Sequence, residues 1–338
     1  SFSAQYSTGA VSLSWTNPDT PDFSGVVVRR SSEGYPGRGG DAICSGNFES
    51  CTDNSVATGT WYYYSAYALD NASNYSAEAR ASAPAILPYT FIVLPDTQYY
   101  SLDYPHLFTT VTEWIASNKD EYNMAVVLHE GDVTHNDTVD EWTNAEESMS
   151  VLDGLLPYVI CTGNHDDTGG STANFNTYFP VSEYESQAHF GGVFEAGNHD
   201  NSYYYFTAGE VDWMVISLEY APRGDAVEWA AGIAEENPDR RIILLNHSYL
   251  RPEGTRSGAG EDIWEGLGKK HAGVTFAFSG HYTASEGSRL VSQGDEGNKV
   301  YQMFANYQNL LFGGTGYIRI VTLDPARRMV SVKTRSAW

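Results

Sequence analysis

The apolar positions of this chain follow two different patterns, and the change falls near residue 85. Residues 11–85 carry short apolar and aromatic alternations such as VSLSW, GVVVRR and TWYYYSAYALD, separated by clusters of Pro, Gly, Asn and Asp. Short alternating runs with turn residues about every ten positions are typical of an all-β sandwich. We therefore expect residues 1–85 to form a small all-β domain.

From Phe91 onward the apolar runs become continuous and alternate with segments of helical periodicity. The runs are FIVLP, MAVVLHEG, YVICTG, WMVISLE, IILLN and VTFAFSG, and the helical segments include residues 106–119 and 139–155. Strands that are apolar throughout are buried on both faces, so we expect a helix-covered sheet and an α/β domain over residues 86–338. The Pro- and Ala-rich stretch at residues 79–88 is typical of a linker.

Polar side chains stand at the C-terminal ends of five of these apolar runs. They are Asp96, Asp132, the group Asn164-His165-Asp166, His247 and His281. Ligands of α/β proteins bind at the carboxyl ends of the strands, so we expect these side chains to meet at one sheet edge. Oxygen and imidazole donors without thiolate suit Zn, Fe or Mn. A carboxylate shared by two ions would hold them about 3.5–4 Å apart, where they clamp phosphate and activate water.

The order of these pieces (D-x, GD, GNHD, H, GH) over residues 91–338 resembles the calcineurin-like metallophosphoesterase family. The resemblance implies a β-sandwich flanked by helices and the hydrolysis of phosphate esters by a metal-bound hydroxide. Residues 1–85, with the early Trp15, the turn NPDTPDFSG and a Tyr-rich run, resemble a fibronectin type III domain. The two domains together resemble the layout of purple acid phosphatases.

The resemblance also implies a set of metal ligands. Asp132 matches the carboxylate that bridges two ions, and Asn164, His247 and His281 match the remaining protein ligands of the second ion, which would be Zn, Mn or Fe. Two divalent ions are therefore expected.

The site of the first ion departs from the family pattern. Gln98 stands where the family has the His of D-x-H, and Thr283 stands where it has the second His of G-H-x-H. Gln98 and Thr283 could supply oxygens to a harder ion such as Mn²⁺, Mg²⁺ or Ca²⁺. Alternatively His135 could replace the tyrosine that ligates the first ion at this spacing in purple acid phosphatases. The third possibility is that the protein binds one ion in total and the first site is empty. An occupied site is favoured, because Asp96 and Asp132 would otherwise form an unpaired carboxylate pair.

The tetrapeptide GNHD occurs twice, at residues 163–166 and 197–200. For the first copy, which ends an apolar run, the resemblance implies that His165 binds the phosphoryl oxygen or protonates the leaving group while Asp166 orients its ring. The second copy follows no apolar run. We interpret it as a structural turn, with a substrate contact through His199 as the alternative.

Several polar and aromatic residues near the expected ligands are candidates for substrate contacts. Besides Asn164 they are Tyr249, Tyr282 and the run Asn306-Tyr307-Gln308. Aromatic residues also fill cores, so burial in the core is the alternative for each tyrosine.

The charge of the chain restricts the partners. Lys and Arg total 19 against 43 Asp and Glu, a formal charge of −24, and such a field repels nucleic-acid duplexes and anionic membranes. No run approaches the roughly 18 apolar residues of a membrane span. We therefore expect a small phosphate ester as substrate and slightly favour a diester, which carries a single negative charge. The alternatives are a phosphomonoesterase or nucleotidase, and a binding protein that kept the fold and lost the chemistry.

The three cysteines suggest an oxidising compartment. Cys44 and Cys51 flank the polar loop CSGNFESC, and a disulfide between them would place the protein outside the cytoplasm, secreted or periplasmic. Two unpaired surface thiols are the alternative. Cys161, in the apolar run PYVIC, is expected to be a small buried hydrophobe. The chain opens at Ser1 without a signal-like segment, from which we expect a processed or recloned mature protein.

Overall fold

The computed structural model describes residues 1–284 and 286–338. These residues divide into two compact units. One unit contains Ser1–Pro88 and Leu323–Val330, and the other contains Tyr89–Thr322 and Ser331–Trp338. Among the described helices, none has the length and apolar character needed to cross a membrane.

The first unit is a sandwich of antiparallel sheets, as its short alternating runs predict. One sheet has the order β1-β2-β5 and the other the order β4-β3-β6-β7. The strands are β1 (Phe2–Ser7), β2 (Ala10–Trp15), β3 (Phe23–Ser31), β4 (Asp41–Gly46), β5 (Ser50–Asp53), β6 (Trp61–Asp70) and β7 (Ala79–Pro84). Alternate side chains point inward, so Val11, Leu13 and Trp15 of β2 meet Tyr62 and Tyr64 of β6 in one core.

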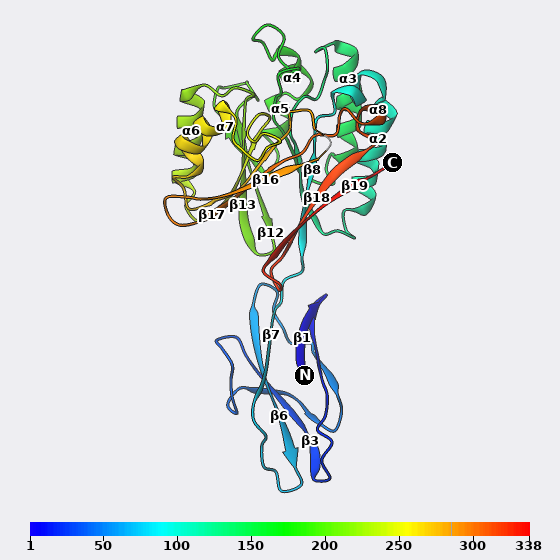
Figure 1. The fold of residues 1–338 in the computed structure, drawn as a ribbon, viewed down its shortest axis with the longest axis vertical. Helices are drawn as coiled ribbons and strands as arrows, with labels where there is room; N and C mark the ends of the chain where they lie inside the picture. The colour runs from blue at the N-terminus through cyan, green and yellow to red at the C-terminus, as the bar shows by residue number, and fades with distance from the viewer. Residues whose placement is uncertain (285) are drawn as a thin grey trace. The chain divides into compact units, whose positions relative to one another are not determined.

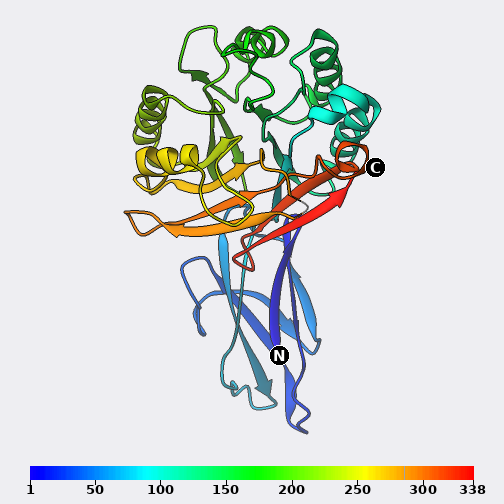
Figure 2. The same ribbon diagram turned by 45° about the horizontal axis from the view of Figure 1, so that its top comes forward.

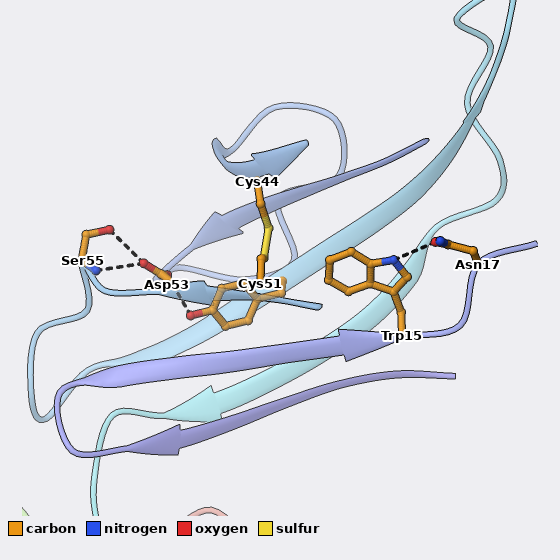
Figure 3. The surroundings of a disulfide bond; sticks show 7 residues. Trp15, Asn17, Cys44, Cys51, Asp53 and Ser55 are labelled. Carbon is orange, nitrogen blue, oxygen red and sulfur yellow. Dashed lines mark hydrogen bonds between the residues drawn. A yellow bond between two sulfur atoms is a disulfide. The ribbon is translucent and has the colours of Figure 1, made fainter. Parts of the chain in front are cut away.

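A disulfide joins the two sheets of this unit. Cys44 lies in β4 and Cys51 in β5, and their Cα atoms are 6.6 Å apart. Figure 3 shows the bond beside Trp15, whose indole N–H donates to the side chain of Asn17 at 3.1 Å. The expected Cys44–Cys51 pairing is therefore confirmed. Cys161 is a buried free thiol, as predicted.

The second unit contains two further sheets, which Figure 1 shows edge-on between helices. The five-stranded sheet has the order β10-β9-β8-β18-β19 and the seven-stranded sheet the order β11-β12-β13-β14-β15-β17-β16. The strands are β8 (Tyr89–Leu94), β9 (Met124–His129), β10 (Tyr158–Ile160), β11 (Phe190–Val193), β12 (Ser202–Ala208), β13 (Val211–Leu218), β14 (Arg241–Asn246), β15 (Val274–Ser279), β16 (Ser288–Gln293), β17 (Lys299–Phe304), β18 (Tyr317–Asp324) and β19 (Met329–Ser336).

Helices cover the outer faces of the two sheets. In Figures 1 and 2, α2 and α3 lie beside the five-stranded sheet, while α6 and α7 lie beside the seven-stranded sheet. The helices are α1 (Gln98–Asp103), α2 (Pro105–Asn118), α3 (Val139–Met149), α4 (Ala173–Tyr178), α5 (Val181–Tyr184), α6 (Gly224–Glu236), α7 (Gly258–Ile263) and α8 (Leu311–Gly314), with a 3-10 turn at Ser150–Leu152 and a π-helical turn at Trp264–Gly268. The helix expected at residues 106–119 is present as α2, and the one expected at residues 139–155 is present as α3 and the 3-10 turn, which ends at Leu152.

Aromatic side chains pack between the two sheets. The ring of Phe91 in β8 lies 5.0 Å from that of Trp213 in β13 and 6.2 Å from that of Phe276 in β15. These edge contacts join β8 of one sheet to strands of the other. The helix-flanked sandwich implied by the family resemblance is confirmed. The expectation of a single sheet edge is wrong, because β8, β9 and β10 belong to one sheet while β14 and β15 belong to the other.

Candidate functional site

The backbone at the strand ends is unusual in two ways: two candidate ligands have left-handed conformations, and two glycines pack closely against carboxylates. Asp132 and His281 both adopt left-handed backbone conformations, with φ of 49° and 72°. Non-glycine residues with such angles cluster at functional sites. A Cβ atom at Gly163 would lie 2.1 Å from Asp132 Oδ1, and one at Gly280 would lie 2.0 Å from Asp96 Oδ1. Glycine is therefore required before Asn164 and before His281, because any side chain there would collide with a carboxylate of the site.

Three of the predicted ligands form a compact donor cluster. Asp132, His247 and His281 each offer one donor atom, and these atoms all lie within 4.8 Å of one another. Within the described part of the chain, no other group of three His, Cys, Asp or Glu side chains is arranged in this way. Asp132 and His247 are fully buried and His281 is partly buried. The structure therefore brings together ligands from the ends of β9, β14 and β15.

The surroundings of His247 call for a positive charge at the cluster. Its Nδ1–H donates to the carbonyl of Glu130 at 2.7 Å, and a carbonyl can only accept. The other ring nitrogen, Nε2, lies 3.1 Å from Asp132 Oδ2 but is not aligned for a hydrogen bond with any described group. A buried imidazole nitrogen beside a carboxylate requires a positive charge, which either a proton on Nε2 or a metal ion can supply.

The side chain of Asn164 is a further candidate ligand. Its Oδ1 is buried and has no hydrogen-bond partner among the described atoms. A buried amide oxygen normally has a partner. Together with Asp132, His247 and His281, the set has one carboxylate, one amide oxygen and two imidazoles, which fits a divalent first-row metal ion.

The pKa values of His247 and His281 reflect the negative charge and the burial of the cluster. Burial disfavours protonated His247, but the carboxylates of Asp132 and Asp96 outweigh burial and raise its pKa to about 10. Burial, followed by the neighbouring His247, lowers the pKa of His281 to about 4, so that His281 is neutral at pH 7. The carboxylates therefore hold a proton on His247 unless a metal ion supplies the charge, while His281 needs no deprotonation to act as a ligand.

His165 is fixed beside the cluster by three interactions. Its backbone N–H donates to Asp132 Oδ1 at 2.9 Å, its Nδ1–H donates to the carbonyl of His135 at 2.7 Å, and its ring stacks on that of His135 with centroids 4.9 Å apart. With Nδ1 engaged, Nε2 is the ring nitrogen left for a substrate.

Asp166 does not act as the sequence predicts. Its buried carboxylate accepts the backbone N–H groups of Gly163, Val133 and Thr134 at 2.9, 3.1 and 2.9 Å. The ring of His165 is held by the His135 carbonyl instead. The idea that Asp166 orients that ring is therefore wrong, and Asp166 ties the loop after β9 to the loop after β10.

The remaining predicted metal ligands lie outside the donor cluster. Asp96 and Gln98 are buried near it, His135 bonds Gln98 through Nδ1 at 3.0 Å, and Thr283 is exposed. Asp96 is linked to the cluster through the backbone N–H of His281, at 3.2 Å. Burial and the nearby Asp132 raise the pKa of Asp96 to about 8.

Two predicted substrate contacts are instead core residues. Tyr249 is 1% exposed and belongs to the apolar cluster between the seven-stranded sheet and α6 and α7. His199 is 2% exposed, with Nδ1 bonded to the carbonyl of Phe179 at 2.7 Å and Nε2 bonded to the hydroxyl of Tyr204. Neither side chain is available to a substrate. Tyr282 remains a candidate, because its ring centroid lies 4.6 Å from that of the partly buried His281.

Tyr220 is a site residue that sequence reasoning missed. Its hydroxyl lies 3.4 Å from His281 Nε2, and its ring centroid is 5.8 Å from that of His247. It follows the end of β13. The sequence feature that could have identified it is the run WMVISLEY, the one apolar run of the six whose end supplied no predicted site residue.

A cavity of about 620 Å³ is lined in part by residues that neighbour the candidate ligands. Thr162 and Gly163, which precede Asn164, form one part of its wall, and Tyr220 forms another. Its charged lining residues are Asp167, Glu195, Asp200, Glu219 and Arg223. The Arg223 guanidinium is bound to Glu195 at 3.0 Å and to Glu219 at 3.0 Å, so the lining is negative overall.

Comparison with known proteins agrees with this geometry. The calcineurin-like phosphoesterase family model matches residues 89–283, which is more than half of the chain. The chain therefore belongs to the calcineurin-like phosphoesterase family. It is 36% identical over 264 residues to the uncharacterized protein YvnB of Bacillus subtilis (strain 168), covering 75% of this chain and 20% of that protein.

Solved structures with the same fold include a purple acid phosphatase. The enzyme PPD1 from yellow lupin seeds is 14% identical, with a TM-score of 0.50, and the match covers 99% of this chain and 71% of that one. A Fn3-like protein from Clostridium thermocellum matches 24% of this chain and 84% of its own, at 28% identity and a TM-score of 0.20.

Proposed function

We propose that this protein hydrolyses phosphate esters with a divalent metal ion held by Asp132, Asn164, His247 and His281, and that it favours diesters. The observation that carries the proposal is the cluster of Asp132, His247 and His281, whose donor atoms all lie within 4.8 Å of one another. Asn164 Oδ1, a buried oxygen without a hydrogen-bond partner among the described atoms, supports a fourth ligand. A bound divalent ion lowers the pKa of water and polarises a phosphoryl oxygen.

The protein groups around the ion have separate tasks. His165, with Nδ1 anchored, offers Nε2 to bind a phosphoryl oxygen or to give a proton to the leaving alcohol. Asp166 holds the two loops that carry Asp132 and Asn164 at a fixed separation. Tyr220 and Tyr282 border His281 and are placed to contact the ester.

The charge of the cavity near the candidate ligands supports the preference for diesters. Glu195 and Glu219 neutralise Arg223, which leaves no free cation among the described residues of the cavity wall to offset the second negative charge of a monoester. A diester carries one negative charge and is repelled less. The formal charge of −24 acts in the same direction.

Metal analysis combined with a substrate screen tests the proposal. Protein prepared without chelator is expected to contain metal and to hydrolyse bis(nitrophenyl) phosphate faster than nitrophenyl phosphate when Mn²⁺ or Zn²⁺ is added. Asn164→Ala and His281→Ala should lose turnover, whereas His106→Ala, an exposed histidine of α2, should not. No metal and no turnover with any ion would establish the rival candidate, a binding protein, which the replacement of histidine by Gln98 and Thr283 favours.

We also propose that the protein works outside the cytoplasm, secreted or periplasmic. The Cys44–Cys51 disulfide supports this placement, because cytoplasmic thiols are kept reduced. Protein from its natural source, alkylated after unfolding without reductant, should carry one label, on Cys161. Three labelled cysteines would contradict the placement.

A further inference from the structure

The neighbourhood of Asp96, where the family places another ion, is filled by side-chain amides. The Asp96 carboxylate is 2% exposed and accepts the backbone N–H of His281 at 3.2 Å and the Nδ2–H of Asn306 at 2.7 Å. Asn306 is fully buried, and its Oδ1 accepts the backbone N–H of Gln308 at 2.9 Å. A backbone N–H can only donate, so the NH₂ group of Asn306 must face Asp96.

Gln98, which replaces a family histidine, has both ends of its amide engaged. Its Oε1 lies 3.0 Å from His135 Nδ1, and its Nε2 bonds the side-chain oxygen of Gln308. Exchanging the oxygen and nitrogen of this amide requires the same exchange in Gln308, because two amide oxygens would otherwise meet, and both ends would then keep the same partners. Thr283, at the other lost histidine, is exposed, whereas Asp96 and Gln98 are buried.

Among the described residues, these hydrogen bonds already engage Asp96 and Gln98, the side chains that a second metal ion would use as ligands. A further ion would share Asp132, would bind Asp96 beside the Asn306 N–H that Oδ2 accepts, and would have to displace His135 or Gln308 to reach Gln98. The donor that already faces Asp96 presents a partial positive charge to any incoming cation. The cluster of Asp132, His247 and His281 is also the only group of three such donors among residues 1–284 and 286–338.

We infer that the protein binds one divalent ion, at Asp132, Asn164, His247 and His281, and that the amides of Asn306, Gln98 and Gln308 take the place of the family's other ion. The inference rests on the proposed function for the ion it keeps. Hydrogen bonds from the Asn306 side chain and the His281 backbone satisfy the buried carboxyl group of Asp96 without a second metal.

The amide network also positions the candidate acid. Gln98 bonds Nδ1 of His135, and the His135 ring also packs on Tyr99, with centroids 4.9 Å apart, and stacks on His165 at an interplanar angle of 17°. The carbonyl of His135 accepts the Nδ1–H of His165. Gln98 is thus a positioning residue that acts on His165 through His135.

Metal counting tests the inference. Metal-free protein dialysed to equilibrium against excess Mn²⁺ should retain one ion per chain by elemental analysis, and its electron paramagnetic resonance spectrum should be that of an isolated ion. Two ions per chain, or the spectrum of an exchange-coupled pair, would overturn the inference and leave the proposed hydrolysis standing. No retained ion would overturn both.

Matched variants locate the single ion. Gln98→Leu, which removes the amide, should still retain one ion, because Gln98 is not a ligand. His281→Ala should retain none, and unchanged thermal melting of the metal-free variants would show that both fold. Loss of the ion from folded Gln98→Leu would overturn the inference. A further readout is the dependence of kcat on pH, which should shift in Gln98→Leu when Gln98 positions His165.

Discussion

At the residue scale, the placement of His165 predicts a role in the chemical step rather than in metal binding. Its ring touches the His135 ring and carbonyl, and only its backbone N–H contacts Asp132. His165→Asn is expected to lower kcat by about 10²–10⁴-fold, the usual contribution of a general acid. The loss should grow as the leaving alcohol becomes more basic. Diesters with a graded series of phenols would measure this dependence.

The control for His165→Asn is the metal content of the variant. It should equal that of the unmodified protein, since no ring nitrogen of His165 belongs to the donor cluster. A variant that lost both its metal and its activity would assign His165 to the metal site and contradict the role of acid.

His199, in the second GNHD, predicts a pH-dependent stability. Burial lowers its pKa from 6.5 to about 4, and its ring is packed 5.5 Å from that of Phe175. The unfolded chain therefore binds a proton more readily than the folded one below pH 6.5. The stabilisation is complete above that pH and is lost as the pH falls toward 4, on the order of 3 kcal/mol in all.

Denaturant unfolding at several pH values measures this effect. The free energy of unfolding should fall more steeply between pH 6.5 and 4 in the natural protein than in His199→Phe, which cannot titrate. The difference between the two curves isolates His199 from other titrating groups. Parallel curves would show that His199 is accessible to protons in the folded state.

The two GNHD copies show what single residues in a sequence can and cannot reveal. The identity of the letters does not separate them, but position after an apolar strand does, and only His165 lies at the cluster. The burial of His199 and Tyr249 could not be predicted. The burial of His199 depends on rings distant in sequence, those of Phe175 and Tyr184.

At the scale of elements, Asp166 joins two loops and predicts an effect on metal affinity. Its carboxylate accepts three backbone N–H groups, from the loop after β9 and the loop after β10. Asn at this position replaces an acceptor by a donor that faces those N–H groups. Asp166→Asn is expected to weaken Mn²⁺ binding by about 10–100-fold, as changes around metal ligands commonly do.

Calorimetric titration with Mn²⁺ checks this expectation. Asp167→Asn is the matched control, because it removes the same charge from the neighbouring, exposed position. Equal weakening in the two variants would mean that the charge, rather than the connection between the loops, supports metal binding.

Strand positions were predictable from the apolar runs, whereas strand partners were not. Each run from Phe91 to Ser279 became a strand, and each expected ligand followed one. The division into sheets of five and seven strands depends on which edges hydrogen-bond, and a uniformly apolar strand carries no information about its partner. The run Asn306-Tyr307-Gln308 was expected near the site as a substrate contact, but the bonds of Asn306 to Asp96 and of Gln308 to Gln98 depend on the position of β17 and were not predictable.

At the scale of the whole molecule, the charge of −24 predicts how salt changes the reaction. Added salt screens the repulsion between the protein and an anionic ester, and the screening length falls from about 30 Å at 0.01 M to about 8 Å at 0.15 M. We expect kcat/KM to rise with ionic strength, and to rise more for a dianionic monoester than for a monoanionic diester. The preference for diesters should therefore narrow at high salt. Initial rates at fixed Mn²⁺ in sodium chloride and in tetramethylammonium chloride separate screening from binding of a particular ion. A fall in kcat/KM in both salts would mean that the substrate meets a positive local field, and would remove the charge argument for diesters.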